Sequence, residues 1–267
     1  MCPNCRALVD SKLNVCGYCD TELGRSRPEP ASGSKFVPQE NFTTAVILLV
    51  NFGLFVATLL MTIKSSEGGG FVMQVGSPIL RLFGAKDALF IAHGEWWRLI
   101  TAGFLHASIF HILMNSWVLL DLGRNAEEVF GTARFIVIYF VANLFGFIAS
   151  LFWSPHAISV GASAAACGLI GAMIAHGYRS GSSHRSFYVR WAVIIVLIGL
   201  MPGFRIDNAA HLGGMAAGFG VAYFAGVPRY AHPIESAWKI LATTILTVVV
   251  YSFYRAYESM VATPFFG

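Results

Sequence analysis

Residues 161–168 read Gly161-Ala162-Ser163-Ala164-Ala165-Ala166-Cys167-Gly168 and open an uncharged stretch of small residues. Farther along, residues 208–214 read Asn208-Ala209-Ala210-His211-Leu212-Gly213-Gly214, a lone histidine in a second apolar stretch. A polar group at membrane depth is costly and usually has a functional reason. A hydroxyl and an imidazole, each on its own hydrophobic helix, therefore suggest hydrolysis inside the bilayer.

The composition of the chain indicates a membrane protein. Its 267 residues are 56% apolar and only 12% charged, which is about half the charge content of a soluble protein. A soluble core could not bury so much apolar surface, so the bilayer is the expected solvent. The net charge of +4 clusters in loops, which fits membrane topology better than nucleic-acid binding. The first long apolar run begins near Asn41 behind a polar segment, so no secretory signal peptide is expected.

Apolar runs predict an all-α bundle of six membrane-spanning helices and a weaker seventh. The segment 64–93 is too polar to span and is expected to form short amphipathic pieces at the interface. The predicted spans are 41–63, about 107–123, a helix that begins near Phe135 and ends at the turn Trp153-Ser154-Pro155, a helix from about Ser163, then 188–202, 208–226 and 235–257.

The distribution of Lys and Arg predicts the orientation. These residues gather before the first span, between the second and third, and between the fourth and fifth, whereas 153–161 has none. Positive loops stay in the cytoplasm, so the N-terminus is predicted to lie inside. Ser163 and His211 then both lie near the external face, as a catalytic pair requires. We expect a multi-pass protein of a bacterial cell membrane.

Serine is a poor nucleophile until a base takes its proton, and His211 is the candidate base. The plain alternative is that Ser163 only packs in its helix or bonds to that helix's own backbone. The Ala and Gly residues around Ser163, with Gly214 and Gly218 beside His211, favour close approach of the two helices. That approach would bring the hydroxyl and the imidazole within hydrogen-bond reach.

Acyl transfer also needs hydrogen-bond donors for the developing oxyanion. The first amides of the predicted Ser163 helix have no partner within that helix. His111 and Asn115 are four residues apart, so both lie on one helix face and can aim N–H groups at the same point. Two alternatives stay open for this pair: interhelical hydrogen bonding alone, or metal ligation, although no carboxylate or third ligand accompanies them.

Four cysteines near the N-terminus predict a metal site. Cys2-Pro3-Asn4-Cys5 and Cys16-Gly17-Tyr18-Cys19 form two CxxC knuckles separated by ten residues, a spacing typical of a tetrahedral zinc site. A cytoplasmic N-terminus keeps the thiols of Cys2, Cys5, Cys16 and Cys19 reduced. The segment resembles a short zinc ribbon in which zinc has a structural role, because it folds a segment too small to fold alone. The partner of this ribbon cannot be inferred from the sequence.

The predicted domains follow from these features. Residues 1–23 form the zinc-ribbon module and 24–40, rich in Pro, Ser, Gly and charge, form a linker. Residues 41–227 form the six-helix domain, and 228–267 contain the seventh helix and the C-terminal tail.

Taken together, these motifs resemble the rhomboid family of intramembrane serine proteases. The resemblance covers about 41–227 and implies a dyad without an Asp, in which Ser163 is the nucleophile and His211 the base. It implies an oxyanion hole from the backbones of Ala162 and Ser163 and the side chains of His111 and Asn115, with no cofactor for catalysis. It also implies transmembrane protein substrates and the six-plus-one helix arrangement of part of the family. The remaining matches have supporting roles: Trp97-Arg98, His106, Glu127, Gly214 and Gly218.

Two positions depart from the family pattern. Ala164 follows the nucleophile where the family usually has Gly, and Cys167 stands where an aromatic ring often stacks on the catalytic His. We therefore expect the imidazole to be held less firmly, or by another aromatic residue.

Two other functions compete with a protease. A catalytically silent relative that binds membrane clients would lack Ser163 or His211, and both are present. A transporter with a histidine proton relay would favour intramembrane carboxylates, which the predicted spans lack apart from Asp121 near one end.

Overall fold

The computed structural model describes Val15 and residues 42–65, 74–181, 184–201, 206–228 and 233–262. All of these except Val15 belong to one compact unit, Glu40–Gly267. The predicted zinc ribbon with its four cysteines, apart from Val15, and the predicted linker lie outside the described residues.

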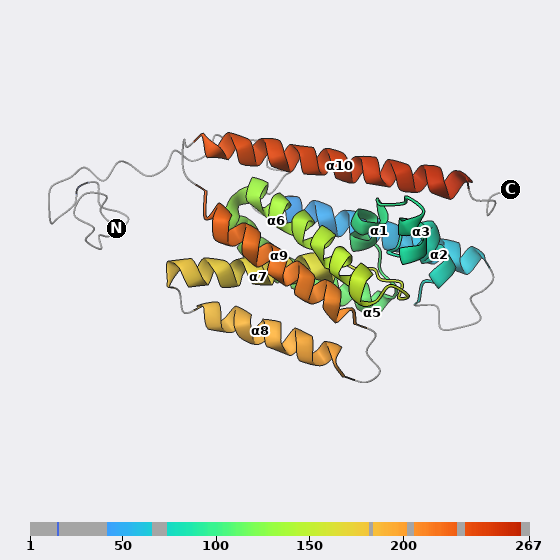
Figure 1. Cartoon of the computed structure of the whole chain (residues 1–267), viewed down its shortest axis with the longest axis horizontal. Coiled ribbons are helices and arrows are strands. Elements are labelled where there is room, and N and C mark those ends of the chain that lie inside the picture. The colour runs from blue at the N-terminus through green and yellow to red at the C-terminus, as the bar shows by residue number, and fades with distance from the viewer. Residues whose placement is uncertain are drawn as a thin grey trace. The chain divides into compact units, whose positions relative to one another are not determined.

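The described part of the chain is helical, and it has no β-strand beyond isolated bridges (Figure 1). Three stretches within it are long and apolar enough to cross a membrane: Phe42–Lys64, Ile109–Trp153 and Ile234–Ala262. The elements in chain order are α1 (Phe42–Lys64), α2 (Ser77–Leu82), α3 (Ala88–Ala92), α4 (Arg98–Thr101), the 3₁₀ turn η1 (Ala102–Phe104), α5 (Ile109–Val118), the π-helical η2 (Leu119–Gly123), α6 (Arg124–Trp153), α7 (Ser163–Ser180), α8 (His184–Gly199), α9 (Asn208–Ala225) and α10 (Ile234–Ala262).

The sequence predicts a loop between the second and third spans. In the structure, the two spans are joined by a kink in a helix. The helix runs from Arg124 to Trp153 with one non-helical residue, Gly131, at φ 69° and ψ 158°. Glycine adopts this positive φ without the clash that a Cβ brings, so the chain changes direction at a single residue. Arg124 and Arg134, expected in a loop, lie on helical segments on either side of this kink.

Helices α6, α7 and α9 form the centre of the bundle and pack against one another, with α8 outside α7 and α10 along α6 (Figure 1). Lipid tails are as apolar as leucine, so helices in a membrane associate through close packing of small residues. A Cβ built on Gly218 would lie 2.1 Å from the Gly168 carbonyl oxygen, and one on Gly214 would lie 2.2 Å from that of Ala164. The backbones of α7 and α9 are therefore in direct contact along the face that carries Ser163 and His211.

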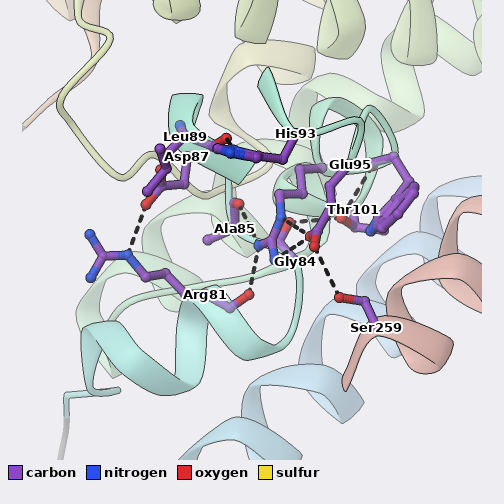
Figure 2. Close-up of polar contacts among 11 residues, drawn as sticks. Arg81, Gly84, Ala85, Asp87, Leu89, His93, Glu95, Thr101 and Ser259 are labelled. Atoms are coloured by element: carbon purple, nitrogen blue, oxygen red, sulfur yellow. Dashed lines mark hydrogen bonds and ion pairs between the residues drawn. The ribbon is translucent and has the colours of Figure 1, made fainter. Parts of the chain in front are cut away.

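The short helices α2, α3 and α4 are fastened together by the buried Arg98, which is 3% exposed. Its guanidinium donates to the carbonyl oxygens of Arg81 at 2.6 Å and Ala85 at 3.1 Å, and to the Glu95 carboxylate at 2.6 Å. Figure 2 shows Arg81, Ala85 and Glu95 in this network, with Ser259 of α10 donating to Glu95. One buried cation thus joins several turns that are too short to be stable alone.

Trp97 and Glu127 each fasten a helix to this bundle. The Trp97 ring is 5% exposed and lies 4.5 Å from the Arg255 guanidinium of α10. The Glu127 carboxylate accepts from the backbone amides of Thr43 and Thr44 at 3.4 and 3.3 Å. A carboxylate at a helix N-terminus satisfies unpaired amides and opposes the helix dipole, so Glu127 caps α1.

Helix α10 is attached near both of its ends. Near its start, Glu235 pairs with the buried Arg134 of α6 at 2.5 and 2.8 Å, and the same guanidinium lies 5.1 Å from the Trp238 ring. Near its end, Ser259 donates to Glu95 at 3.2 Å.

Candidate active site

Ser163 and His211 lie side by side at the starts of α7 and α9. Ser163 is the first residue of α7 and His211 lies in the first turn of α9. The His211 Nε2 atom is 2.8 Å from the Ser163 Oγ atom. Ser163 is half-buried, and His211 is 7% exposed. Two residues that are 48 positions apart in the chain are therefore in hydrogen-bond contact, which is the geometry that a hydroxyl nucleophile and its base require.

The other ring nitrogen of His211, Nδ1, is buried and has no hydrogen-bond partner among the described residues. The nearby Asp207 carboxylate is occupied elsewhere. It caps α9 by accepting from the Ala210 amide at 3.0 Å, and it accepts from the Ser150 hydroxyl. Within the described part of the chain, the serine and the histidine thus form a pair with no carboxylate on the imidazole.

His111 and Asn115 on α5 face the residues that precede Ser163. Gly161 has a φ of +124°, and a Cβ built on it would lie 2.6 Å from His111 Nε2 and 3.7 Å from Asn115 Nδ2. Because glycine has no Cβ, the His111 ring can approach the backbone closely at this point. One amide hydrogen of Asn115 donates to the His111 carbonyl at 3.0 Å, so its second hydrogen can serve another acceptor.

His106 and Ser108 support His111 from the preceding loop. The His106 ring is fully buried and lies edge-on to the His111 ring, with 5.1 Å between centroids. The Ser108 hydroxyl caps α5 by accepting from the His111 amide at 3.2 Å. The structure therefore places His106 behind His111, away from the Ser163 hydroxyl.

The first departure from the family pattern has a local explanation. Ala164 is 1% exposed, and its Cβ lies against Gly146 of α6, where a Cβ built on Gly146 would be only 2.8 Å from it. A glycine on the neighbouring helix therefore makes room for the methyl group of Ala164. Cys167, at the second departure, is 2% exposed and lies in the helix interface.

Lys86, which the sequence analysis did not identify as a site residue, contacts the segment that leads into Ser163. This side chain is fully buried and donates to the carbonyl oxygens of Ser154 at 2.7 Å, Ala157 at 3.1 Å and Ser150 at 3.4 Å. Its backbone pairs with Ser159 through two hydrogen bonds of 3.1 Å. Lys86 thus caps the C-terminal end of α6 and holds the segment that leads into Ser163.

Lys86 and Asp207 belong to one network around Ser150. The Ser150 carbonyl accepts from Lys86, and its hydroxyl donates to Asp207, the cap of the helix that carries His211. Burial lowers the pKa of Lys86, and the carboxylates of Asp207 and Asp87 act in the opposite direction. The network therefore joins the segment before Ser163 to the helix start before His211.

Comparison with known proteins identifies the family. Residues 93–228, about half of the chain, match the family described as the rhomboid domain. This chain belongs to the rhomboid family. The matched rhomboid domain begins in the loop before Arg98 and ends after α9, so it contains Ser163, His211, His111 and Asn115.

Several curated rhomboid proteins are similar to the chain. Rhomboid protease GluP of Bacillus subtilis (strain 168) is 37% identical over 203 residues, which are 72% of this chain and 38% of GluP. Rhomboid-like protease 3 of Toxoplasma gondii is 33% identical over 180 residues, 63% of this chain and 68% of that protein. RHOMBOID-like protein 1 of Arabidopsis thaliana is 34% identical over 161 residues, 57% of this chain and 41% of that protein. The chain therefore spans less than half of GluP and of the Arabidopsis protein.

Proposed function

We propose that this rhomboid protein is an intramembrane serine endopeptidase that cleaves transmembrane segments of other membrane proteins. The observation that carries the proposal is the 2.8 Å contact between Ser163 Oγ and His211 Nε2 within a domain of apolar helices. The similarity to proteins named as rhomboid proteases supports the same function. The six-plus-one arrangement, with the N-terminus in the cytoplasm of a bacterium, belongs to this proposal.

In the proposed reaction, neutral His211 accepts the Ser163 proton at Nε2 while Oγ attacks the scissile carbonyl carbon. The imidazole is then protonated on both nitrogens. It gives the Nε2 proton to the leaving amine. Water hydrolyses the resulting ester of Ser163, with His211 again as the base. This sequence returns both side chains to their starting state and needs no metal or cofactor.

The negative charge that develops on the carbonyl oxygen requires fixed donors. The Ala162 and Ser163 amides at the start of α7, the second amide hydrogen of Asn115, and His111 Nε2–H would supply them in this proposal. The position of His111 and Asn115 supports it, because a Cβ built on Gly161 would lie 2.6 Å from His111 Nε2 and 3.7 Å from Asn115 Nδ2, so both side chains lie near the backbone that precedes Ser163.

A direct test is labelling with a serine-directed fluorophosphonate in detergent or liposomes. The wild-type protein should be labelled at Ser163, and His211→Ala should lose labelling because no base remains to activate the hydroxyl. A silent, client-binding relative would bind single-span membrane proteins without labelling and without cleaving them. That result would replace the protease proposal.

Asn115→Ala should lower kcat by about 10²- to 10³-fold, as expected when one oxyanion donor is lost. KM should change little, because the donor acts mainly on the transition state. The pH profile of kcat should keep its shape, since an amide does not titrate near neutral pH. A shifted pH profile with an unchanged kcat would contradict this role.

For the N-terminal segment we propose a structural zinc module that takes no part in the chemistry. The chain of residues 1–267 should carry about one zinc ion, as a four-cysteine site binds, and should lose it when Cys2 and Cys5 are both replaced by Ser. Metal content measured by mass spectrometry checks this expectation. Cleavage of a model substrate should persist in the same variant. Loss of cleavage with a folded membrane domain would show that the module participates in catalysis or its control.

A further inference from the structure

A cavity of about 300 Å³ lies between α5 with η2, α7 and α8, away from the Ser163–His211 pair. Its wall is formed by aromatic and aliphatic side chains in equal number, with the Tyr188 hydroxyl and a single carboxylate, that of Asp121, as its polar groups. The residues used in the argument below are Trp117, Asp121, Ile170, Phe187 and Trp191.

The carboxylate of Asp121 is exposed and lies within the apolar stretch Ile109–Trp153. Among the described residues it forms no ion pair or side-chain hydrogen bond, not even with Arg124 one turn away. The side-chain amide of Asn125 donates to the main-chain oxygen of Asp121 at 2.9 Å. The carboxylate of Asp121 is therefore not used in this hydrogen bond. Asp121 lies near one end of its predicted span, and a carboxylate next to apolar membrane segments generally has a partner that offsets its charge.

The aromatic rings around Asp121 suit a positively charged partner. The Trp117 and Trp191 rings are 6.5 Å apart at 71°, and Phe187 lies 6.4 Å from Trp191 at 66°. Trp117 is 58% exposed and Phe187 is 44% exposed, so both rings are open to an incoming group. Aromatic faces attract cations, and they do so more strongly when water is excluded. A carboxylate beside such faces therefore selects a cation over an apolar or acidic group.

The same helices carry the proposed catalytic residues. Asp121 follows Asn115 by six residues along α5 and η2, a rise of about 9 Å. On α7, Ile170 of the cavity wall follows Ser163 by seven residues, a rise of about 10 Å. A substrate chain bound at Ser163 covers that distance with about three extended residues or seven helical ones.

We propose that this cavity, the Asp121 pocket, binds the side chain of a Lys or Arg in the membrane segment of the substrate, three to seven residues from the scissile bond. The inference rests on the proposed protease function and names a charge preference of its substrates. A long basic side chain reaches the pocket while its aliphatic stem remains in apolar surroundings. The pocket thus fixes which peptide bond of a bound segment lies at Ser163.

The test is a charge exchange between enzyme and substrate. One single-span substrate is prepared with Lys, Gln or Glu at each position three to seven residues on either side of the cut. Cleavage in liposomes of phosphatidylglycerol and phosphatidylethanolamine is measured for the wild type, Asp121→Asn and Asp121→Lys. Each rate is divided by the rate of the same enzyme on the Gln substrate, so that a general loss of activity cancels. Glu128→Gln serves as the control, because Glu128 is an exposed carboxylate on α6 outside the cavity wall.

At one position the wild type and Glu128→Gln should cleave the Lys substrate about tenfold faster than the Glu substrate, a factor typical of a cation held by a carboxylate and aromatic rings. Asp121→Asn should abolish this preference and Asp121→Lys should reverse it. An unchanged preference in Asp121→Asn would overturn the inference. Equal rates on all substrates, with a dependence on phosphatidylethanolamine that Asp121→Asn removes, would instead assign the pocket to a lipid headgroup. Failure of the wild type to cleave even the Gln substrate would count against the proposed protease function itself.

Discussion

Ser163→Ala should leave the protein folded and able to bind a single-span substrate, but unable to cleave it. The change removes one oxygen atom from a half-buried position at the start of α7 and disturbs no helix contact. Loss of the nucleophile in a serine protease lowers kcat by roughly 10⁶-fold, so product should fall below detection. The measurement is the appearance of cleaved substrate in liposomes over time, together with the melting temperature of the variant.

A matched control is available on a neighbouring helix. Ser116 is a half-buried serine on α5, next to Asn115 in sequence, and its hydroxyl makes no contact that the proposal uses. Ser116→Ala should retain the wild-type rate within a few fold. Equal cleavage by Ser163→Ala and the wild type would remove Ser163 from the reaction, whatever its distance to His211.

The approach of α7 to α9 was predictable from the sequence because its cause is local. Gly214 and Gly218 follow His211 at helical spacing, and small residues surround Ser163. Helices in lipid approach closely where their side chains are small, and the structure places the Gly218 and Gly168 backbones in contact. The sequence likewise predicted short helices in the segment before α5, because its charges interrupt each apolar run too soon for a span.

The connection between the second and third predicted spans was not predictable in the same way. The charges of Arg124 and Arg134 suggested a loop, yet both lie on helical segments and only Gly131 interrupts them. Arg134 remains buried because Glu235 of α10 pairs with it. That pair joins residues 101 positions apart, so no local pattern could reveal it.

Lys86 was missed for a similar reason. In the sequence, Lys86 is one of several charged residues in the mixed polar segment 64–93. This segment was predicted to lie at the membrane interface. Its partners Ser150, Ser154 and Ala157 are 64 to 71 residues away and all accept through the backbone. Every residue type has a backbone carbonyl, so no sequence motif indicates which carbonyls accept from Lys86. The signal that was available is the stop of an apolar run at Ser154-Pro155, which leaves the last carbonyls of α6 in need of donors.

Lys86→Met should both destabilise the protein and slow the labelling of Ser163. Methionine retains the apolar stem and removes the three donors, so the carbonyls at the end of α6 lose their cap and Asp207 loses a nearby positive charge. Leaving a buried carbonyl without its donor costs roughly 1–3 kcal/mol, and Lys86 serves three of them. The segment from Ser154 to Ala162 should then become less ordered, and the rate of fluorophosphonate labelling should fall more than substrate affinity does. Lys64→Met, at an exposed lysine that ends α1, is the control for loss of a positive charge.

A double-mutant cycle separates this network from a general packing defect. If Lys86 and Asp207 act together through Ser150, the cost of Lys86→Met in free energy of unfolding should be smaller in an Asp207→Asn background, because the carboxylate that needed compensation is gone.

Ser150→Ala should lower the free energy of unfolding by less than Lys86→Met does, about 1–3 kcal/mol, since it removes a single hydrogen bond and leaves one carboxylate oxygen unpaired. It should still slow labelling, because it releases the cap of the helix that carries His211. Strictly additive costs of Lys86→Met and Asp207→Asn, with normal labelling in Ser150→Ala, would mean that Lys86 only fastens α6 and has no part in holding the Ser163–His211 pair.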